Sequence, residues 1–137
     1  MIQERTFAMI KPDAVKARVT GNIITLIEKN MFDILRLQKI HLTKDKVERF
    51  YAVHSHRPFF AEMVSFIASG PVIVMALEKE NAVAAWRRLM GATNPQDADE
   101  GTIRKLFGIS IGQNAVHGSD AIETACEELG LFFPDLT

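Results

Sequence analysis

The segment from Val72 to Leu77 is an unbroken apolar run, bounded by Gly70-Pro71 on one side and Glu78 on the other. It is far shorter than the about 20 residues of a membrane helix, and between turn residues it is typical of a strand buried on both faces. The chain has 137 residues, enough to bury a core of its own. Because the sequence contains no repeat, low-complexity stretch or linker, one continuous domain over residues 1–137 is expected.

Apolar periodicity and capping residues predict the elements around this run. They are a strand over residues 5–10, a helix over 21–28, a strand over 32–42, a helix over 43–51, a helix after Pro58, a helix over 81–90 and a last helix that begins at Ser119. Asn30 is expected to end a helix as a left-handed cap, and Thr43, Asn81 and Ser119 are expected to cap the starts of helices. Imperfect alternation allows a bulge near Arg36. Residues 91–118 show little periodicity and are expected to form a long functional loop. This order predicts an α+β fold, a ferredoxin-like sandwich whose four-stranded antiparallel sheet is covered by helices on one face.

The charge balance limits the class of partner. Sixteen basic and 17 acidic residues leave a net charge of −1, which argues against a protein whose main partner is nucleic acid. The single cysteine, Cys126, cannot form an internal disulfide. With Ile122 and Leu129 it forms an apolar stripe at helical spacing, which predicts a core position. The first residues have neither the basic flank nor the apolar stretch of a secretory signal. A cytoplasmic protein with no membrane partner is expected.

The sequence has neither a G-x-x-x-x-G-K-[ST] phosphate loop nor a G-x-G-x-x-G motif. It has instead His117, followed by Gly118 and by the predicted start of the last helix, where partial positive charge favours a phosphate. An ordinary imidazole is mostly neutral at pH 7 and so has a lone pair for attack, and a carboxylate can hold its ring. Glu127 and Glu128 lie further along the same helix, and only one of them can point inward. The alternative is a histidine that ends a strand and bonds its own loop.

Basic side chains near this histidine shift the balance toward phosphate chemistry. Arg87, Arg88 and Arg104 flank the long loop, Arg57 precedes Pro58, and Lys11 ends the first strand. Three or four of these cations together would neutralise and orient a triphosphate. Arg87 and Arg88 are adjacent in a helix and point about 100° apart, so both cannot serve equally.

Seven short blocks in a fixed order complete the pattern. They are Lys11-Pro12-Asp13, Tyr51, Arg57-Pro58-Phe59-Phe60, Ser69-Gly70-Pro71, Gly91-Ala92-Thr93-Asn94-Pro95, Gly101-Thr102-Ile103-Arg104 and Asn114-Ala115-Val116-His117-Gly118-Ser119-Asp120. With these blocks, the chain closely resembles nucleoside diphosphate kinase over nearly its whole length. The segment N-x-x-H-G-S-D is highly specific to that family.

The resemblance implies a role for each matching residue. His117 matches the histidine that accepts a phosphate and passes it on in a ping-pong cycle, and Glu128 and Ser119 match the groups beside its ring. Residues that match the surroundings of the phosphates are Lys11, Tyr51, Arg57, Arg87, Thr93 and Arg104. Lys11 and Asn114 also match the groups that contact the ribose, and Phe59, Met63 and Ile111 match those around the base. The favouring of Arg87 over Arg88 rests on this resemblance alone.

The resemblance also implies partners and a cofactor. The substrates would be nucleoside triphosphates and diphosphates, with Mg²⁺ carried by their phosphates and no metal ligand from the protein. The chain would form a homo-oligomer, a hexamer or tetramer built from dimers. Two other hypotheses stay open: a regulatory nucleotide-binding module without turnover, and a scaffold associated with nucleic acid.

Overall fold

The computed structural model describes residues 3–136, which form one four-stranded antiparallel sheet in the order β2-β3-β1-β4. The strands are β1 (Gln3–Ile10), β2 (Asp33–Ile40), β3 (Val72–Glu80) and β4 (Val116–Gly118). Residues 72–77 of β3 are all buried, so the predicted central strand is confirmed. Between Ile34 and Arg36 the pairing of β2 with β3 shifts, which confirms the bulge near Arg36.

Seven helices and three short 3₁₀ turns connect the described strands. They are α1 (Pro12–Lys16), α2 (Thr20–Lys29), α3 (Lys44–Phe50), η1 (Ala52–His54), α4 (Phe60–Ile67), α5 (Ala82–Met90), η2 (Pro95–Asp97), α6 (Ile103–Phe107), α7 (Ile122–Phe132) and η3 (Pro134–Leu136). The predicted long loop over 91–118 therefore contains η2, α6 and β4. Its helical pieces are too short to show a periodic apolar stripe. None of the described helices has the length and apolar content needed to cross a membrane.

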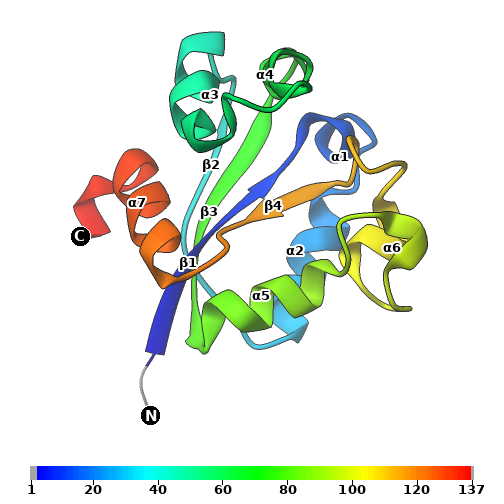
Figure 1. The fold of residues 1–137 in the computed structure, drawn as a ribbon. Helices are drawn as coiled ribbons and strands as arrows, with labels where there is room; N and C mark the ends of the chain where they lie inside the picture. The colour runs from blue at the N-terminus through cyan, green and yellow to red at the C-terminus, as the bar shows by residue number, and fades with distance from the viewer. Residues whose placement is uncertain (1–2, 137) are drawn as a thin grey trace.

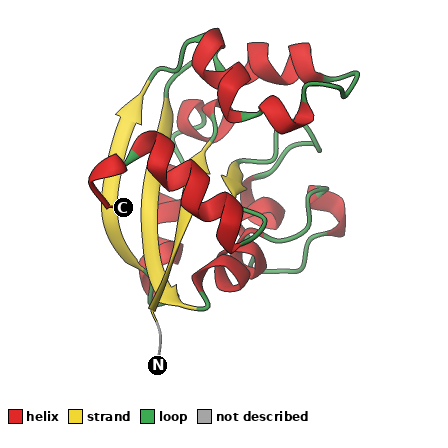
Figure 2. Cartoon of the chain, turned by 60° about the vertical axis from the view of Figure 1, so that its left-hand side comes forward, coloured by secondary structure: helices red, strands yellow, loops and turns green. Residues whose placement is uncertain are grey.

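Helices cover both faces of the sheet, and not one face as the sequence order suggested (Figure 1). Along β1, successive side chains alternate between the faces. Ala8 and Ile10 pack with α2 and α5, while Phe7 and Met9 pack with α3, α4 and α7. Figure 2 shows the strands as one sheet with helices packed against it. The second layer follows from the apolar run in β3, because a strand buried on both sides needs a cover on both sides.

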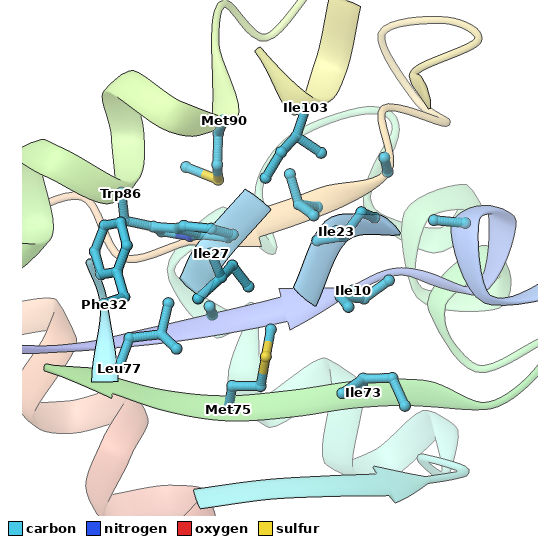
Figure 3. Packing of buried hydrophobic residues seen from close by; sticks show 14 of the residues in the cluster. Ile10, Ile23, Ile27, Phe32, Ile73, Met75, Leu77, Trp86, Met90 and Ile103 are labelled. Atoms are coloured by element: carbon cyan, nitrogen blue, oxygen red, sulfur yellow. The ribbon is translucent and has the colours of Figure 1, made fainter. Parts of the chain in front are cut away.

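The cluster under α2 and α5 determines where β4 lies (Figure 3). Trp86 of α5 is fully buried and meets the Phe32 ring edge-on, with 6.1 Å between the ring centroids. Gly118 of β4 lies so close to Trp86 that a Cβ there would be 2.4 Å from the indole Cδ1. Only glycine permits this approach, and it brings the end of β4 against α5.

Helix termini show where local patterns hold and where tertiary contacts replace them. The Thr43 hydroxyl accepts a hydrogen bond from the Lys46 N–H and caps α3, as predicted. Asn81 precedes α5 but its side chain forms no capping bond, and its φ is 54°. The Glu4 carboxylate of β1 instead accepts from the Val83 N–H at 2.9 Å. The cap of α5 therefore comes from another strand.

Two further expectations about helices are wrong. The residue with left-handed backbone after α2 is Met31, with φ 68°, while Asn30 has φ −91°. Cys126 is exposed on α7, as is Ile122, and of the predicted stripe only Leu129 is buried. The face of α7 that meets the sheet carries Ala125 and Leu129, so the helix is rotated relative to the expected stripe.

Candidate active site

His117 lies in the middle of β4, opposite Met9 of β1. It points toward the face covered by α3 and α7, and its side chain is 20% exposed. The imidazole meets the rings of Phe50 and Tyr51 edge-on, with centroids 5.3 and 5.4 Å away. The ring is therefore neither sealed in the core nor free on the surface, and aromatic edges restrict its orientation.

A carboxylate and a hydroxyl occupy the inner side of the imidazole. Glu128 Oε2 lies 3.4 Å from His117 Nε2, and Glu128 Oε1 accepts a hydrogen bond of 2.6 Å from Ser119 Oγ. The Nε2 atom is buried and forms no hydrogen bond with any described residue, because the Glu128 contact has the length of an ion pair only. Of the adjacent pair, Glu128 is half-buried and Glu127 is exposed, so only one points inward, as expected.

Ser119 serves this contact and does not cap α7. The helix begins at Ile122, and the Thr124 hydroxyl accepts from the Ala121 N–H at its start. Ser119 is buried, with 1% of its surface exposed, because its hydroxyl reaches down to Glu128. The prediction that Ser119 caps the last helix is therefore wrong: the N-cap is Ala121, two residues later.

A second polar group lies at the start of β4. Lys11 Nζ donates to Asn114 Oδ1 at 2.8 Å, and Asn114 Nδ2 donates to the Thr93 carbonyl oxygen at 3.0 Å. Asn114 is buried, so its amide links the end of β1 to the segment after α5. Burial, together with the nearby Arg104, lowers the pKa of Lys11 to about 8, although Asp13 acts in the opposite direction. Lys11 is thus a cation whose charge is lost at mildly alkaline pH.

Arg104 links the segment after α5 to β4. Its guanidinium donates to the carbonyl oxygens of Gly91 and Val116 at 3.0 and 2.9 Å. Burial and the charge of Arg87 lower the pKa of Arg104 to about 10, which leaves it charged at neutral pH. Arg87 itself is half-exposed and forms an ion pair of 3.0 Å with Asp120.

Tyr51 and Arg88 differ sharply in their surroundings. Tyr51 is buried, and burial together with the charge of Glu128 raises the pKa of its phenol above the usual range, so the hydroxyl stays protonated. Arg88 lines a cavity of about 230 Å³ with Phe32, Lys79 and Leu89, away from the His117 contacts. Arg87, and not Arg88, therefore faces the histidine side of α5.

The residues expected around the base form a more exposed group. Phe59 is 49% exposed at the start of α4, and the Arg57 guanidinium lies 5.9 Å from its ring centroid. Ile111 is 60% exposed, and Met63 is half-buried on α4. Within residues 3–136, hydrogen bonds, ion pairs and ring contacts do not join these four residues to His117. The exposed ring of Phe59 and the exposed side chain of Ile111 are available to a ligand.

Three contacts around His117 involve residues to which the sequence analysis assigned no role. Phe50 lies against the imidazole, the Trp86 indole N–H donates to the His117 carbonyl oxygen at 3.3 Å, and Asp13 accepts from the Ala115 N–H at 3.0 Å. Asp13 follows Lys11-Pro12 in one of the quoted blocks, so its place in the motif was the available signal. Phe50 and Trp86 carry no such signal, since apolar residues at helical spacing are ordinary core residues.

The described residues offer no group of three or more histidine, cysteine, aspartate or glutamate side chains that would hold a metal ion. His54 ends η1 and is half-buried, and His56 lies in the turn that follows and is exposed. The chemistry of this site is therefore that of one imidazole, one carboxylate and several nitrogen cations. Such a set of charges suits a phosphate group.

Comparison with known proteins gives a consistent result. A family model described as nucleoside diphosphate kinase matches residues 4–137. The chain is 57% identical over 133 residues to the nucleoside diphosphate kinase of Geotalea uraniireducens (strain Rf4), with 97% of each chain covered. It is similar to the orthorhombic crystal form of the Aquifex aeolicus enzyme, with a TM-score of 0.96, 38% identity and 98% of each chain covered. It is also similar to a halophilic enzyme from Halobacterium salinarum in complex with CDP, with a TM-score of 0.92, 40% identity and coverage of 96% of this chain and 88% of that one. The predicted family and the ferredoxin-like fold class are confirmed.

Proposed function

The chain belongs to the nucleoside diphosphate kinase family and is a phosphotransferase of that class, and from this premise we propose that it works through a phosphohistidine on His117. In this proposal a nucleoside triphosphate donates its terminal phosphate and a nucleoside diphosphate later accepts it. The observation that carries the proposal is the asymmetry of the imidazole. Its Nε2 is buried against Glu128, while part of the ring remains exposed.

The asymmetry assigns a role to each ring nitrogen. We place the ring proton on Nε2, which lies 3.4 Å from Glu128 Oε2, and this leaves the Nδ1 lone pair free to attack. In the first half-reaction, Nδ1 forms a bond to the γ-phosphorus, and the bond from phosphorus to the bridging oxygen breaks with its electrons left on the diphosphate. In the second half-reaction, a terminal oxygen of the acceptor diphosphate attacks that phosphorus, and the imidazole recovers its lone pair. Glu128 stabilises the positive charge that the ring gains, and Ser119 holds Glu128.

The cations would neutralise the phosphates during both steps. Phosphoryl transfer asks little covalent chemistry of a protein and much charge stabilisation and alignment. We assign this task to Lys11, Arg57, Arg87 and Arg104, with Thr93 and the protonated Tyr51 as further polar contacts. Mg²⁺ would be supplied with the nucleotide substrate and would neutralise part of the phosphate charge.

The nucleoside would lie between Asn114 and the exposed apolar group. Lys11 and Asn114 are assigned to the ribose, and Phe59, Met63 and Ile111 to the base. Stacking on an exposed ring does not read the edges of a base, because every base has a similar aromatic face. We therefore infer broad tolerance of the base.

Phe59→Ala should weaken nucleotide binding by ~1–3 kcal/mol, the usual cost of one lost stacking contact. The ring is half-exposed, so its removal should leave the fold intact. Isothermal titration calorimetry with ADP and GDP measures the loss, and Leu106→Ala, which removes another exposed apolar side chain, is the matched control. Unchanged affinity in Phe59→Ala would remove this residue from the base site.

Initial-rate kinetics test the proposed reaction sequence. With ATP as donor and a second nucleoside diphosphate as acceptor, a ping-pong cycle produces parallel lines in double-reciprocal plots. Lines that intersect would mean that both nucleotides must be bound together, which would contradict a free phosphohistidine intermediate. Comparison of GDP, CDP and UDP as acceptors tests base tolerance in the same assay.

We also propose that the chain forms a homo-oligomer built from dimers that pair along β2. This strand lies at the edge of the sheet, and Leu37 in it is 43% exposed. An open edge with an exposed apolar side chain favours pairing with a second strand. Whether the dimers assemble into a tetramer or a hexamer does not follow from this edge.

Leu37→Lys should weaken the dimer, because a two-fold axis would bring like charges together across the paired strands. Analytical ultracentrifugation at micromolar concentration should show an oligomer for the native chain and a larger monomer fraction for the variant. Leu131→Lys on α7, at a similarly exposed leucine, should behave as the native chain. A native chain that is a stable monomer would refute the proposal.

Two broader inferences complete the proposal. We infer that residues 1–137 form one domain, since both hydrophobic clusters share the strands of one sheet. We also infer a cytoplasmic location, because the chain has a single cysteine and that thiol is exposed and unpaired.

A further inference from the structure

We propose that Asp13 is a positioning residue for phosphate transfer: its carboxylate holds the backbone turn that presents His117. This inference rests on the proposed function of His117. Asp13 touches neither the imidazole nor the Lys11 amine directly, and it acts through the residues between them.

The turn before β4 has an unusual backbone. Ala115 has φ 74°, a conformation that residues with a Cβ rarely adopt, and it is fully buried. The Val116 N–H donates to the Asn114 carbonyl oxygen at 2.9 Å, which closes a tight three-residue turn around Ala115. His117 follows two residues later, so the direction in which β4 leaves this turn determines where the imidazole points.

Lys11 and Asp13, at the start of α1, hold this turn from both sides. Asp13 Oδ2 accepts the Ala115 N–H at 3.0 Å, and the Lys11 N–H donates to the Ala115 carbonyl oxygen at 2.8 Å. The backbone N–H and the carbonyl oxygen of Ala115 are therefore both bound by residues 11–13. Strain of this kind persists only where the surroundings hold it. Removal of the Asp13 carboxylate would leave the buried Ala115 N–H without its hydrogen-bond acceptor.

The second Asp13 oxygen has a different task. Oδ1 is buried and forms no hydrogen bond with any described residue. Burial of a carboxylate oxygen in this way is costly unless a nearby positive charge compensates for it. Burial and the charge of Arg104 on α6 lower the pKa of the Lys11 amine, and the charge of Asp13 raises it. Asn114 supplies the only described hydrogen bond to that amine. Asp13 therefore also favours the charged form of the Lys11 amine.

The pH dependence of His117 phosphorylation separates this role from a purely structural one. With γ-labelled ATP, kcat/KM for labelling reports groups of the free enzyme. For the native chain, labelling should fall as pH rises through about 8, where Lys11 loses its proton. Asp13→Asn keeps an oxygen for the Ala115 N–H but removes the charge, so the fall should move to lower pH. At pH 6, where Lys11 is protonated in both, the two proteins should label at similar rates.

A second measurement does not depend on activity. Reductive ¹³C-methylation of the lysines, followed by NMR titration, reports the pKa of Lys11 directly, and Lys11→Arg assigns its signal. The pKa should be lower in Asp13→Asn and unchanged in Asp45→Asn, which removes an exposed carboxylate of α3. An unchanged pKa and an unchanged pH profile in Asp13→Asn would overturn the proposed electrostatic role.

The holding of the turn has its own test. Asp13→Ala should lower the melting temperature, and addition of Ala115→Gly should recover part of that loss, because glycine adopts a positive φ without strain. The pH profile of the double variant should stay shifted. A melting temperature of Asp13→Ala equal to the native value would refute the holding role. If the native chain never acquires label on His117, the proposed function is wrong. If the native chain is labelled but the Asp13 variants do not show the expected changes, only the inference about Asp13 is wrong.

Discussion

Replacing His117 by alanine will abolish phosphate transfer while nucleotide binding survives. The nucleophile is then absent, but Lys11 and Arg104 keep their hydrogen bonds to Asn114, Gly91 and Val116 and still present positive charge. Loss of a nucleophile that forms a covalent intermediate costs on the order of 10⁴-fold or more in kcat. A coupled assay for ATP formation measures the loss, and calorimetry with ADP should give a Kd within about threefold of the native value.

His41→Ala is the matched control for this substitution. The His41 ring bonds the Ala68 carbonyl oxygen at the end of α4 and is exposed, so its removal should leave turnover unchanged. If His117→Ala turned over at a near-native rate, the phosphate would have to pass directly between nucleotides. A native chain that binds nucleotides without turnover would instead be a regulatory nucleotide-binding module.

Arg104→Ala should lower kcat by about 10²–10³-fold, the usual effect of removing one preorganised group that stabilises the transferring charge. Arg104 is held by two backbone carbonyl oxygens, so its charge is already in place before a nucleotide binds. The substitution also leaves those carbonyl oxygens without their donor, and a modest drop in melting temperature is expected. Steady-state kinetics and thermal unfolding should be measured on the same preparation.

Arg88→Ala separates the effect of this site from a general loss of charge. It removes the same type of side chain from α5, on the side that lines the cavity with Phe32 and Leu89. Turnover of Arg88→Ala should match the native enzyme. Near-native kcat in Arg104→Ala, or an equal loss in both variants, would contradict the assigned role of Arg104.

Local sequence patterns predicted the elements whose cause is local. The Val72–Leu77 run needs no partner to identify it as a buried strand, and the Thr43 hydroxyl caps the helix that directly follows it. Local sequence patterns did not predict contacts that depend on residues far away in the sequence. The cap of α5 comes from Glu4 on β1, and Ser119 is drawn to Glu128 and not to the helix start.

Periodicity also left the rotation of α7 undecided. Two stripes of apolar residues are possible on that helix, and the one that includes Ile122 and Cys126 faces away from the sheet. The helix turns its Ala125 and Leu129 side inward, and the same rotation directs Glu128 at His117. Packing against β1, which no window of the sequence contains, selects this orientation.

The candidate site was predictable to the extent that its motif is specific. The block around His117 and the match to Glu128 came from the family resemblance, and the structure brings these two residues within 3.4 Å. The motif also contained Asp13 but offered no reason to assign it a role. That reason is the positive φ of Ala115, a backbone property that an alanine in the sequence does not reveal.

Direct detection of a phosphorylated intermediate tests the central claim most sharply. The native chain is incubated with γ-labelled ATP and Mg²⁺, separated from nucleotide, and digested for mass spectrometry. The account predicts an acid-labile, base-stable label on the peptide that contains His117, and its prompt discharge by ADP, GDP or CDP. A chain that transfers phosphate without acquiring this label, or that carries it on another residue, would contradict the account.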